Sequence, residues 1–344
     1  MKIFQIYTTL RHQGGLEKTL LKVSEDLAKD NEVYIISDDE DFPMPNNVKH
    51  IYAPLLKGGI FNYIKSYFIL KKIIKKHSPE ICQSHHRLTT MLLTPLKKAF
   101  NFKLVHTAQV NFTDKKYFKY AKADVYIAVG HEVVRNLTEM FAVPKDKITI
   151  IYNSGEPFSV DESETDTLTN SAVVVGRLSE QKGHKYLVDA WVDVVKELPD
   201  AKVYFVGDGD LRPDIEAQIK ANKLEESVIL KGFMSPPQPM INKAEFLILP
   251  SLWEGLPLIV LEAFAINKTA VATAVDGTKE IILDGETGYI VPPKDPKALA
   301  EATIKMFKNK DKRKEMAVNA NKLYQKHFTE EKMLSDYRNL LMSI

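Results

Sequence analysis

The sequence has almost no cysteine: Cys82 is the only one in 344 residues. A single thiol cannot form a disulfide within the chain, which fits a reducing compartment. No apolar run approaches the roughly eighteen residues that a membrane-spanning helix needs. The amino-terminal run Lys2–Tyr7 is too short for a signal peptide and is typical of a buried first strand. These absences predict a cytoplasmic protein, either free or peripheral on the inner face of the cytoplasmic membrane.

Metal-binding patterns are also missing. No group of His, Cys, Asp and Glu has the spacing of a metal site. Asp208-Gly209-Asp210 resembles a carboxylate pair that could hold a cation, but it joins a predicted strand to a predicted helix. A turn is the simpler interpretation of that segment. We therefore expect no metal and no other cofactor.

Acidic residues are scarce in one part of the chain. Residues 57–122 contain fourteen Lys or Arg and two acids, whereas the net charge of the whole chain is only +2. This local excess of positive charge indicates an anionic partner for part of the first half. No motif for binding RNA or DNA accompanies it, so we do not expect nucleic acid.

One predicted helix, 60–76, combines this charge with aromatic residues. At 100° per residue, Leu70 and Ile74 fall on a face suited to a core, whereas Phe61 and Phe68 fall among lysines such as Lys71. Interleaved lysines and aromatics favour an anionic lipid surface. The alternative is a solvated basic face whose phenylalanines pack beneath a neighbouring segment.

Strand and helix patterns alternate along the whole chain, which indicates α/β architecture with parallel sheets. In the first half we predict strands at 2–7, 32–37, 48–53, 80–84, 103–107, 125–129 and 147–152, with helices at 16–29 and 60–76. In the second half we predict strands at 171–176, 201–207, 228–231, 246–250 and 269–274, and helices at 184–197, 211–221, 257–266, 296–307 and 311–341. The acidic segment 161–167 is typical of a linker between two domains.

The most informative motif is Ser251–Glu262, which reads SLWEGLPLIVLE. An apolar strand precedes it, and Pro257 suits the start of a helix. Glu254 should therefore lie on a strand-to-helix loop, where Gly255 lets a ligand approach the backbone, and Glu262 about two turns into the helix. Such loops are where open α/β sheets bind ligands. Two carboxylates at that edge suit the hydroxyl groups of a sugar.

A second motif, Val173–His184, reads VVVGRLSEQKGH. A buried strand ends at Gly176, and Arg177 and Lys182 follow on the loop before an amphipathic helix. The planar guanidinium and the mobile ammonium can together neutralise a diphosphate, and the helix adds its amino-terminal amides.

Together the two motifs resemble those of the family 4 retaining glycosyltransferases of the GT-B fold. The G-R-L-x-x-x-K-G signature and the E-x7-E element stand in the family's order, and the resemblance covers nearly the whole chain. It implies two Rossmann-like domains facing a central cleft. The first, 1–155, would bind the acceptor, and the second, 156–327, the nucleotide sugar. The final helix, 328–344, would cross back to the first domain.

The resemblance also implies roles for individual residues. Arg177, Lys182, Glu254 and His106 would be catalytic, with His106 contacting the donor sugar from the end of a strand. His85 and His86, which end the preceding strand, are alternatives to His106. The donor would be bound by Gly14, Gly15, Gly176, Arg177, Lys182, Glu254, Gly255, Leu256, Leu258 and Glu262.

The predicted function is that of a retaining hexosyltransferase. It would move a sugar from a nucleoside diphosphate, with UDP-sugar favoured, to a lipid-linked or polysaccharide acceptor at the cytosolic membrane face. A catalytically inactive GT-B partner subunit is one alternative, but Arg177, Lys182, Glu254 and Glu262 are all present. A GT-B enzyme of other chemistry, such as a sugar-nucleotide epimerase, is another, although the glutamate spacing fits a transferase better.

Overall fold

The structure is a computed structural model that describes residues 1–8, 15–39, 43–56, 59–109, 111, 122–155, 168–275 and 277–344. It divides into two compact units. The first consists of Met1–Asn153 together with Glu331–Ile344, and the second of Ser154–Glu330. Gly14 and the predicted linker 161–167 lie outside the described residues.

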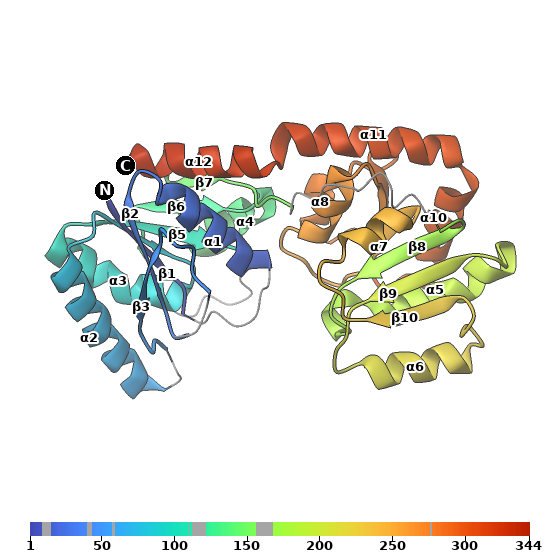
Figure 1. Ribbon diagram of the computed structural model, residues 1–344, viewed down its shortest axis with the longest axis horizontal. Coiled ribbons are helices and arrows are strands. Elements are labelled where there is room, and N and C mark those ends of the chain that lie inside the picture. The colour runs from blue at the N-terminus through green and yellow to red at the C-terminus, as the bar shows by residue number, and fades with distance from the viewer. Residues whose placement is uncertain are drawn as a thin grey trace. The chain divides into compact units, whose positions relative to one another are not determined.

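The first unit is built on a parallel sheet (Figure 1). Its strands within the described residues are β1 (Lys2–Ile6), β2 (Glu32–Ser37), β3 (Lys49–Tyr52), β4 (Ile81–Ser84), β5 (Lys103–Ala108), β6 (Val125–Ala128) and β7 (Ile148–Ile150). Their order across the sheet is β3-β2-β1-β4-β5-β6-β7. The chain therefore runs outward from β1 in one direction and from β4 in the other, so the order reverses between these two strands.

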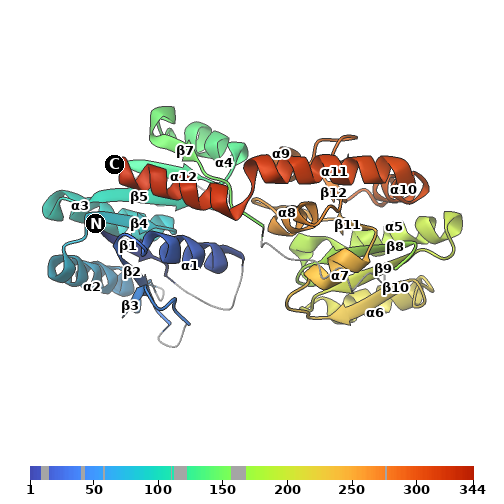
Figure 2. The same cartoon turned by 45° about the horizontal axis from the view of Figure 1, so that its top comes forward.

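Helices cover both faces of this sheet, as a parallel sheet requires. They are α1 (Gly15–Leu27), α2 (Ile60–His77), α3 (Arg87–Phe100), α4 (His131–Arg135) and α12 (Glu330–Met342). Residues of α1 and α12 share one core with Ile3 and Ile81, whereas residues of α2, α3 and α4 share another with Phe4 and Ile6. In both views α2 and α3 run side by side (Figure 2).

The second unit has its own parallel sheet. The described strands are β8 (Ser171–Val175), β9 (Lys202–Val206), β10 (Val228–Gly232), β11 (Phe246–Leu249), β12 (Ala270–Thr273) and β13 (Gly288–Val291). Their order is β10-β9-β8-β11-β12-β13, so here the order reverses between β8 and β11. The main helices are α5 (His184–Glu197), α6 (Arg212–Ala221), α7 (Gln238–Lys243), α8 (Leu258–Ala265), α9 (Thr278–Ile281), α10 (Pro296–Lys308) and α11 (Lys310–His327).

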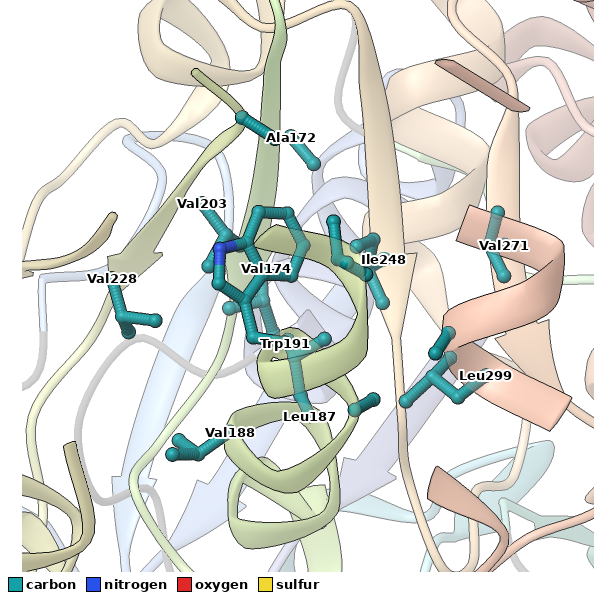
Figure 3. Packing of buried hydrophobic residues seen from close by; sticks show 14 of the residues in the cluster. Ala172, Val174, Leu187, Val188, Trp191, Val203, Val228, Ile248, Val271 and Leu299 are labelled. Carbon is teal, nitrogen blue, oxygen red and sulfur yellow. The ribbon is translucent and has the colours of Figure 1, made fainter. Parts of the chain in front are cut away.

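A large apolar cluster fills one face of the second sheet (Figure 3). Trp191 of α5 is fully buried there and lies among side chains of the strands, including Val174 and Ile248. Leu299 of α10 packs from the same side. Burial of this surface holds α5 against β8, and so fixes the loop that joins them.

The carboxyl-terminal segment is helical, as predicted over 311–341. It consists of α11 and α12, which are separated at Phe328, where the final helix was predicted to begin, and the side chain of Phe328 is buried. Met333 and Tyr337 of α12 are buried against the sheet of the first unit. Arg338 holds both carboxylate oxygens of Asp26 at 2.7 and 2.6 Å. The predicted return of the last helix to the first domain is therefore confirmed.

The predicted fold is confirmed as two parallel-sheet α/β domains. In the described ranges, the α-helices α3, α4, α7 and α9 and the strand β13 were not predicted. In the described part of the chain, no helix has both the length and the apolar composition that crossing a bilayer would require.

Candidate active site

The site lies where the strand order of the second sheet reverses. β8 and β11 are neighbours, and the chain leaves them toward opposite edges. Loops at the carboxyl ends of such a strand pair diverge and leave room for a ligand. The loop after β8 carries Arg177 and Lys182, and the loop after β11 carries Glu254. The fold thus brings together two motifs that stand more than seventy residues apart.

Glu254 and Lys182 form an ion pair at the centre of the site. Lys182 Nζ lies 2.6 Å from Glu254 Oε1, and the glutamate side chain is only 8% exposed. Ser251 Oγ donates a second hydrogen bond, also 2.6 Å long, to the same oxygen. Among the described residues, no donor reaches Oε2. One carboxylate oxygen is therefore held by the protein, and the other remains able to accept bonds from a ligand.

Backbone contacts fasten the two loops to each other. Leu252 N donates to Gln181 O at 2.7 Å, and Gln181 Nε2 donates to Trp253 O at 3.0 Å. Gly183, which precedes α5, has φ 63°, and a Cβ there would lie 2.1 Å from Pro250 O. Only glycine allows this combination of conformation and close approach. The position of Lys182 relative to Glu254 is thus set by the backbone as well as by the ion pair.

Arg177 is exposed at the start of the same loop, just after Gly176. Within the described ranges no carboxylate pairs with its guanidinium, whose charge is therefore free to meet an anion. A Cβ on Gly209 would come within 3.0 Å of Arg177 Cγ, so the loop after β9 lies close beneath this side chain. In that loop Asp208 accepts from Arg212 Nη1 at 3.2 Å.

Glu262 lies on α8, little more than one turn from its start at Leu258 rather than the two turns that we predicted. Its Oε2 accepts a hydrogen bond of 2.9 Å from Nε2 of Gln238, a buried residue of α7. Gly155 passes so near that a Cβ would lie 2.8 Å from Glu262 N. Packing and hydrogen bonding thus give this carboxylate a defined position.

The other predicted donor residues of this unit lie on the same segment. Gly255 and Leu256 precede α8, and a Cβ on Gly277 would lie 1.8 Å from Gly255 O. The turn before α9 therefore packs directly against this loop. The predicted helix start at Pro257 is one residue early, since α8 begins at Leu258 and Pro257 is its cap.

Three predicted residues belong to the first unit. Gly15 begins α1, and Gly14 lies outside the described residues. His106 is fully buried on β5, where its Nδ1 lies 2.8 Å from Thr90 Oγ1 of α3. Burial lowers the pKa of His106 to about 3, so the ring is neutral at physiological pH. The role of His106 at the donor sugar stays a prediction. The described residues enclose its ring.

The basic–aromatic face of α2, defined here as Phe61, Ile64, Lys65, Phe68, Lys71, Lys72 and Lys75, is a separate surface feature. Phe61, Ile64 and Phe68 are 83%, 53% and 59% exposed. Leu70 and Ile74, on the opposite side of the helix, are fully buried. The alternative in which the phenylalanines pack beneath a neighbour is therefore wrong for the described residues.

Some residues that shape the site were not predicted. Ser251 binds Glu254 but, like most serines near a turn, carries no signal of its own in the sequence. Gln238 reaches Glu262 from the segment Ser235–Pro239, where prolines mark a loop and nothing marks a partner for a glutamate 24 residues away. Both depend on proximity that only the fold creates.

Comparison with known families agrees with this geometry. The family described as "Glycosyl transferases group 1" matches residues 157–323, which contain Arg177, Lys182, Glu254 and Glu262. The family described as "Glycosyltransferase Family 4" matches residues 13–154. The two matches together span most of the chain.

Several characterised and uncharacterised proteins are similar in sequence. An α-D-kanosaminyltransferase of Streptomyces kanamyceticus is 35% identical over 148 residues, but the match covers only 42% of this chain and 38% of that protein. An uncharacterized glycosyltransferase of Methanocaldococcus jannaschii is 29% identical over 91% of this chain and 90% of its own. The GalNAc-α-(1→4)-GalNAc-α-(1→3)-diNAcBac-PP-undecaprenol α-1,4-N-acetyl-D-galactosaminyltransferase of Campylobacter jejuni is 24% identical, with coverage of 98% and 99%.

Solved structures share the fold. A glycosyltransferase from Rickettsia africae superimposes with a TM-score of 0.83 at 22% identity, covering 99% of this chain and 98% of that one. HepE of Anabaena in complex with UDP gives 0.85 at 16% identity over the full length of both chains. The fold is thus that of the GT-B glycosyltransferases. With its two domains, the chain belongs to the family 4-type glycosyltransferases and is an enzyme of the hexosyltransferase type.

The close approach of Gly183 to Pro250 yields a direct test. Gly183→Ala should destabilise the protein because its Cβ would overlap Pro250 O, in addition to the cost of a left-handed alanine. Gly285→Ala is the matched control, since Gly285 has φ 75° but nothing within 4 Å of its Cβ position. The control should lose about 1–2 kcal/mol of unfolding free energy, and Gly183→Ala at least about 2 kcal/mol more. Urea unfolding measures both, and equal losses would contradict the proposed contact between the loops.

Proposed function

We propose that this glycosyltransferase transfers a hexose from a nucleoside diphosphate sugar to a glycan-bearing acceptor, with retention of anomeric configuration. The observation that carries the proposal is the environment of Glu254. One of its oxygens is fixed by Lys182 and Ser251, and no described residue donates to the other, at the switch point of the second sheet. A buried, oriented carboxylate that can still accept hydrogen bonds suits the hydroxyl groups of a donor sugar.

The diphosphate would bind to Arg177 and Lys182. Arg177 is exposed and can meet the phosphates with its planar fork, whereas Lys182 would approach from beside Glu254. Negative charge grows on the diphosphate as its bond to the sugar breaks. Two cationic side chains held at that point would stabilise the developing charge. Since they supply this charge, we propose that transfer needs no metal ion.

Glu262 would bind the ribose. Its carboxylate is oriented by Gln238, which donates to one oxygen at 2.9 Å. It lies on the helix that follows the Glu254 loop, so the two carboxylates serve different parts of one ligand. A ribose hydroxyl pair is a suitable partner for a carboxylate held in this way.

Retention is the stereochemistry that fits these residues. Lys182 and Ser251 already occupy one oxygen of Glu254, so this carboxylate would orient the sugar rather than attack it. In the proposed reaction the leaving phosphate removes the proton of the acceptor hydroxyl on the face from which it departs. No side-chain base is then required on the opposite face.

UDP-sugar is the donor that we propose to test first. HepE, whose fold this chain shares, is described in complex with UDP, UDP-glucose, and UDP with glucose. For the acceptor, two Campylobacter jejuni relatives are named for substrates linked to undecaprenol diphosphate. We therefore propose a lipid-linked or polysaccharide acceptor, bound by the first unit.

We further propose that the enzyme is peripheral at the cytosolic membrane face and docks through the basic–aromatic face of α2. No acidic residue interrupts the sequence of α2, and its exposed lysines lie beside three exposed apolar side chains. Lysines supply long-range attraction to anionic lipid, and phenylalanines supply apolar burial at the interface. A lipid-linked acceptor would be reached from that position.

Donor binding tests the diphosphate assignment. Arg177→Ala and Lys182→Ala should each weaken UDP binding by about ten- to a hundred-fold, because each removes a charge-assisted contact worth roughly 1.5–3 kcal/mol. Lys185→Ala removes an exposed cation from α5, the helix that follows this loop, and should leave affinity within about two-fold. Isothermal titration calorimetry gives the three dissociation constants.

The same variants should be compared for nucleoside diphosphate release from a panel of UDP-, GDP- and dTDP-sugars, with and without EDTA. Release by the unaltered enzyme should survive EDTA. Unchanged UDP affinity in both the Arg177 and Lys182 variants would contradict the assignment of these residues to the diphosphate. Complete loss of nucleoside diphosphate release in EDTA, restored by manganese, would contradict the metal-independent mechanism.

Membrane docking has its own test. Vesicle sedimentation should show binding that rises with the fraction of phosphatidylglycerol and falls with salt. Lys71→Glu with Lys72→Glu should weaken binding at least about ten-fold, since each lysine near an anionic surface is worth about 1 kcal/mol. Lys322→Glu with Lys326→Glu, a pair of exposed lysines on α11, is the matched control and should bind normally. Equal recovery of all three proteins on neutral and anionic vesicles would contradict docking through α2.

A further inference from the structure

The first sheet has a switch point of its own. β1 and β4 are paired neighbours, and the chain leaves them toward opposite edges of the sheet. Tyr7 follows β1 and His85 follows β4, so both stand at the carboxyl edge where the loops diverge. Their rings are in contact, with centroids 5.8 Å apart. By the same rule that places the site in the second unit, this edge should bind a ligand.

A polar layer separates this edge from the apolar core. On the sheet face covered by α1 and α12, Ile3 and Ile81 are core residues, but the next positions toward the edge are Gln5 and Gln83. Both glutamines are fully buried. Gln5 Nε2 donates to Gln83 Oε1 at 2.9 Å, and Gln83 Nε2 donates to Thr107 Oγ1 at 2.7 Å. Thr107 in turn hydrogen-bonds Tyr337 of α12.

Such a polar layer stabilises a sheet interior no better than apolar side chains would. Each buried amide must be fully bonded, and apolar side chains of similar shape would stabilise the fold at least as well. A satisfied buried network does, however, fix the orientation of each of its members. This chain of hydrogen bonds ends at one group on the edge of the sheet.

That group is His85. Its Nε2 lies 3.0 Å from Gln5 Oε1. Gln5 already donates through its amide nitrogen to Gln83, so its oxygen accepts and His85 Nε2 must carry the proton. The lone pair is then on Nδ1, to which no described residue is bonded. The surrounding protein lowers the pKa of His85 to about 4, so the ring stays neutral and keeps this tautomer at physiological pH.

Other hydrogen-bonding groups line the same edge. Tyr7 bonds Glu17 of α1. Gln109, which follows β5, accepts from Asn153 Nδ2 at 3.0 Å. Asn153 is only 2% exposed, yet among the described residues its Oδ1 has no hydrogen-bond partner. A buried acceptor with no donor indicates that something else supplies one.

We propose that this edge is a subsite for a sugar of the acceptor, in which His85 Nδ1 accepts a hydrogen bond from a sugar hydroxyl. Gln5 and Gln83 are positioning residues that hold the required tautomer, and Asn153 Oδ1 offers a second acceptor. The ring orients the hydroxyl and does not deprotonate it, because so weak a base would take up little of the proton. The assignment of this sugar to the acceptor rests on the proposed function, whereas the tautomer and the sugar binding can be measured without turnover.

Nitrogen-15 NMR of the histidine side chains tests the positioning. In the intact protein His85 should be protonated at Nε2 only, without titrating between about pH 5 and 8. Gln5→Met keeps the length of the side chain but removes its acceptor, so the two tautomers should become mixed. A His85 ring that titrates near its ordinary pKa, or that keeps the same tautomer in Gln5→Met, would overturn the positioning role.

Methyl α-glycosides of glucose, galactose, N-acetylglucosamine and N-acetylgalactosamine, at millimolar concentration, test the subsite without a lipid chain that could bind α2. At least one should shift the Nδ1 signal saturably, and Gln5→Met should weaken its binding about ten-fold. His85→Ala should abolish sugar binding but leave UDP affinity unchanged. His327→Ala, at the end of α11 in the second unit, is the matched control and should bind the sugar normally. If no glycoside shifts His85, or if His85→Ala still binds it, the subsite is refuted. Failure of UDP to bind any of these proteins would instead refute the donor assignment.

Discussion

The ion pair between Lys182 and Glu254 is the interaction on which the second unit's site depends. A carboxylate that is 8% exposed would cost several kcal/mol if it were left without a partner. Lys182 and Ser251 satisfy one of its oxygens and thereby tie together loops that follow different strands. The close packing of Gly183 on Pro250 makes the same connection through the backbone. The protein therefore holds two groups in place before any ligand binds: the cation that we propose for the phosphates, and the Glu254 oxygen, unpaired among the described residues, that we propose for the sugar.

The two units share one feature of sheet topology. In each sheet the strand order reverses once, between β1 and β4 or between β8 and β11, and polar side chains gather at the carboxyl ends of those strands. In the second unit the polar groups are charged, which suits a nucleoside diphosphate. In the first, the described polar groups are mostly neutral amides, hydroxyls and imidazoles, with the carboxyl group of Glu17 bonded to Tyr7, and such a set suits the hydroxyl groups of a glycan. The difference in chemistry between the two edges supports the assignment of donor and acceptor to different units.

Hydrophobic periodicity predicted much of this architecture. The strand Glu32–Ser37 has the predicted bounds because both of its ends are marked by polar residues. The helix Arg87–Phe100 was not predicted, since Pro95 interrupts its pattern. That omission matters for His106: without α3, the sequence could not show that the ring is covered. The glutamate and lysine positions could be placed on loops because strand-to-helix turns are local. The bond from Ser251 to Glu254 could not, because it depends on side-chain directions that the tertiary structure sets.

The stereochemistry of transfer tests the account most directly. Proton NMR of the anomeric region, recorded early in turnover with the first sugar nucleotide that the enzyme accepts, gives the configuration of the newly formed glycosidic bond. We predict that it matches the configuration of the donor, because in the proposed reaction the leaving phosphate acts on the face from which it departs. A product of inverted configuration would require a base on the opposite face, and would contradict the roles assigned to Lys182, Arg177 and Glu254.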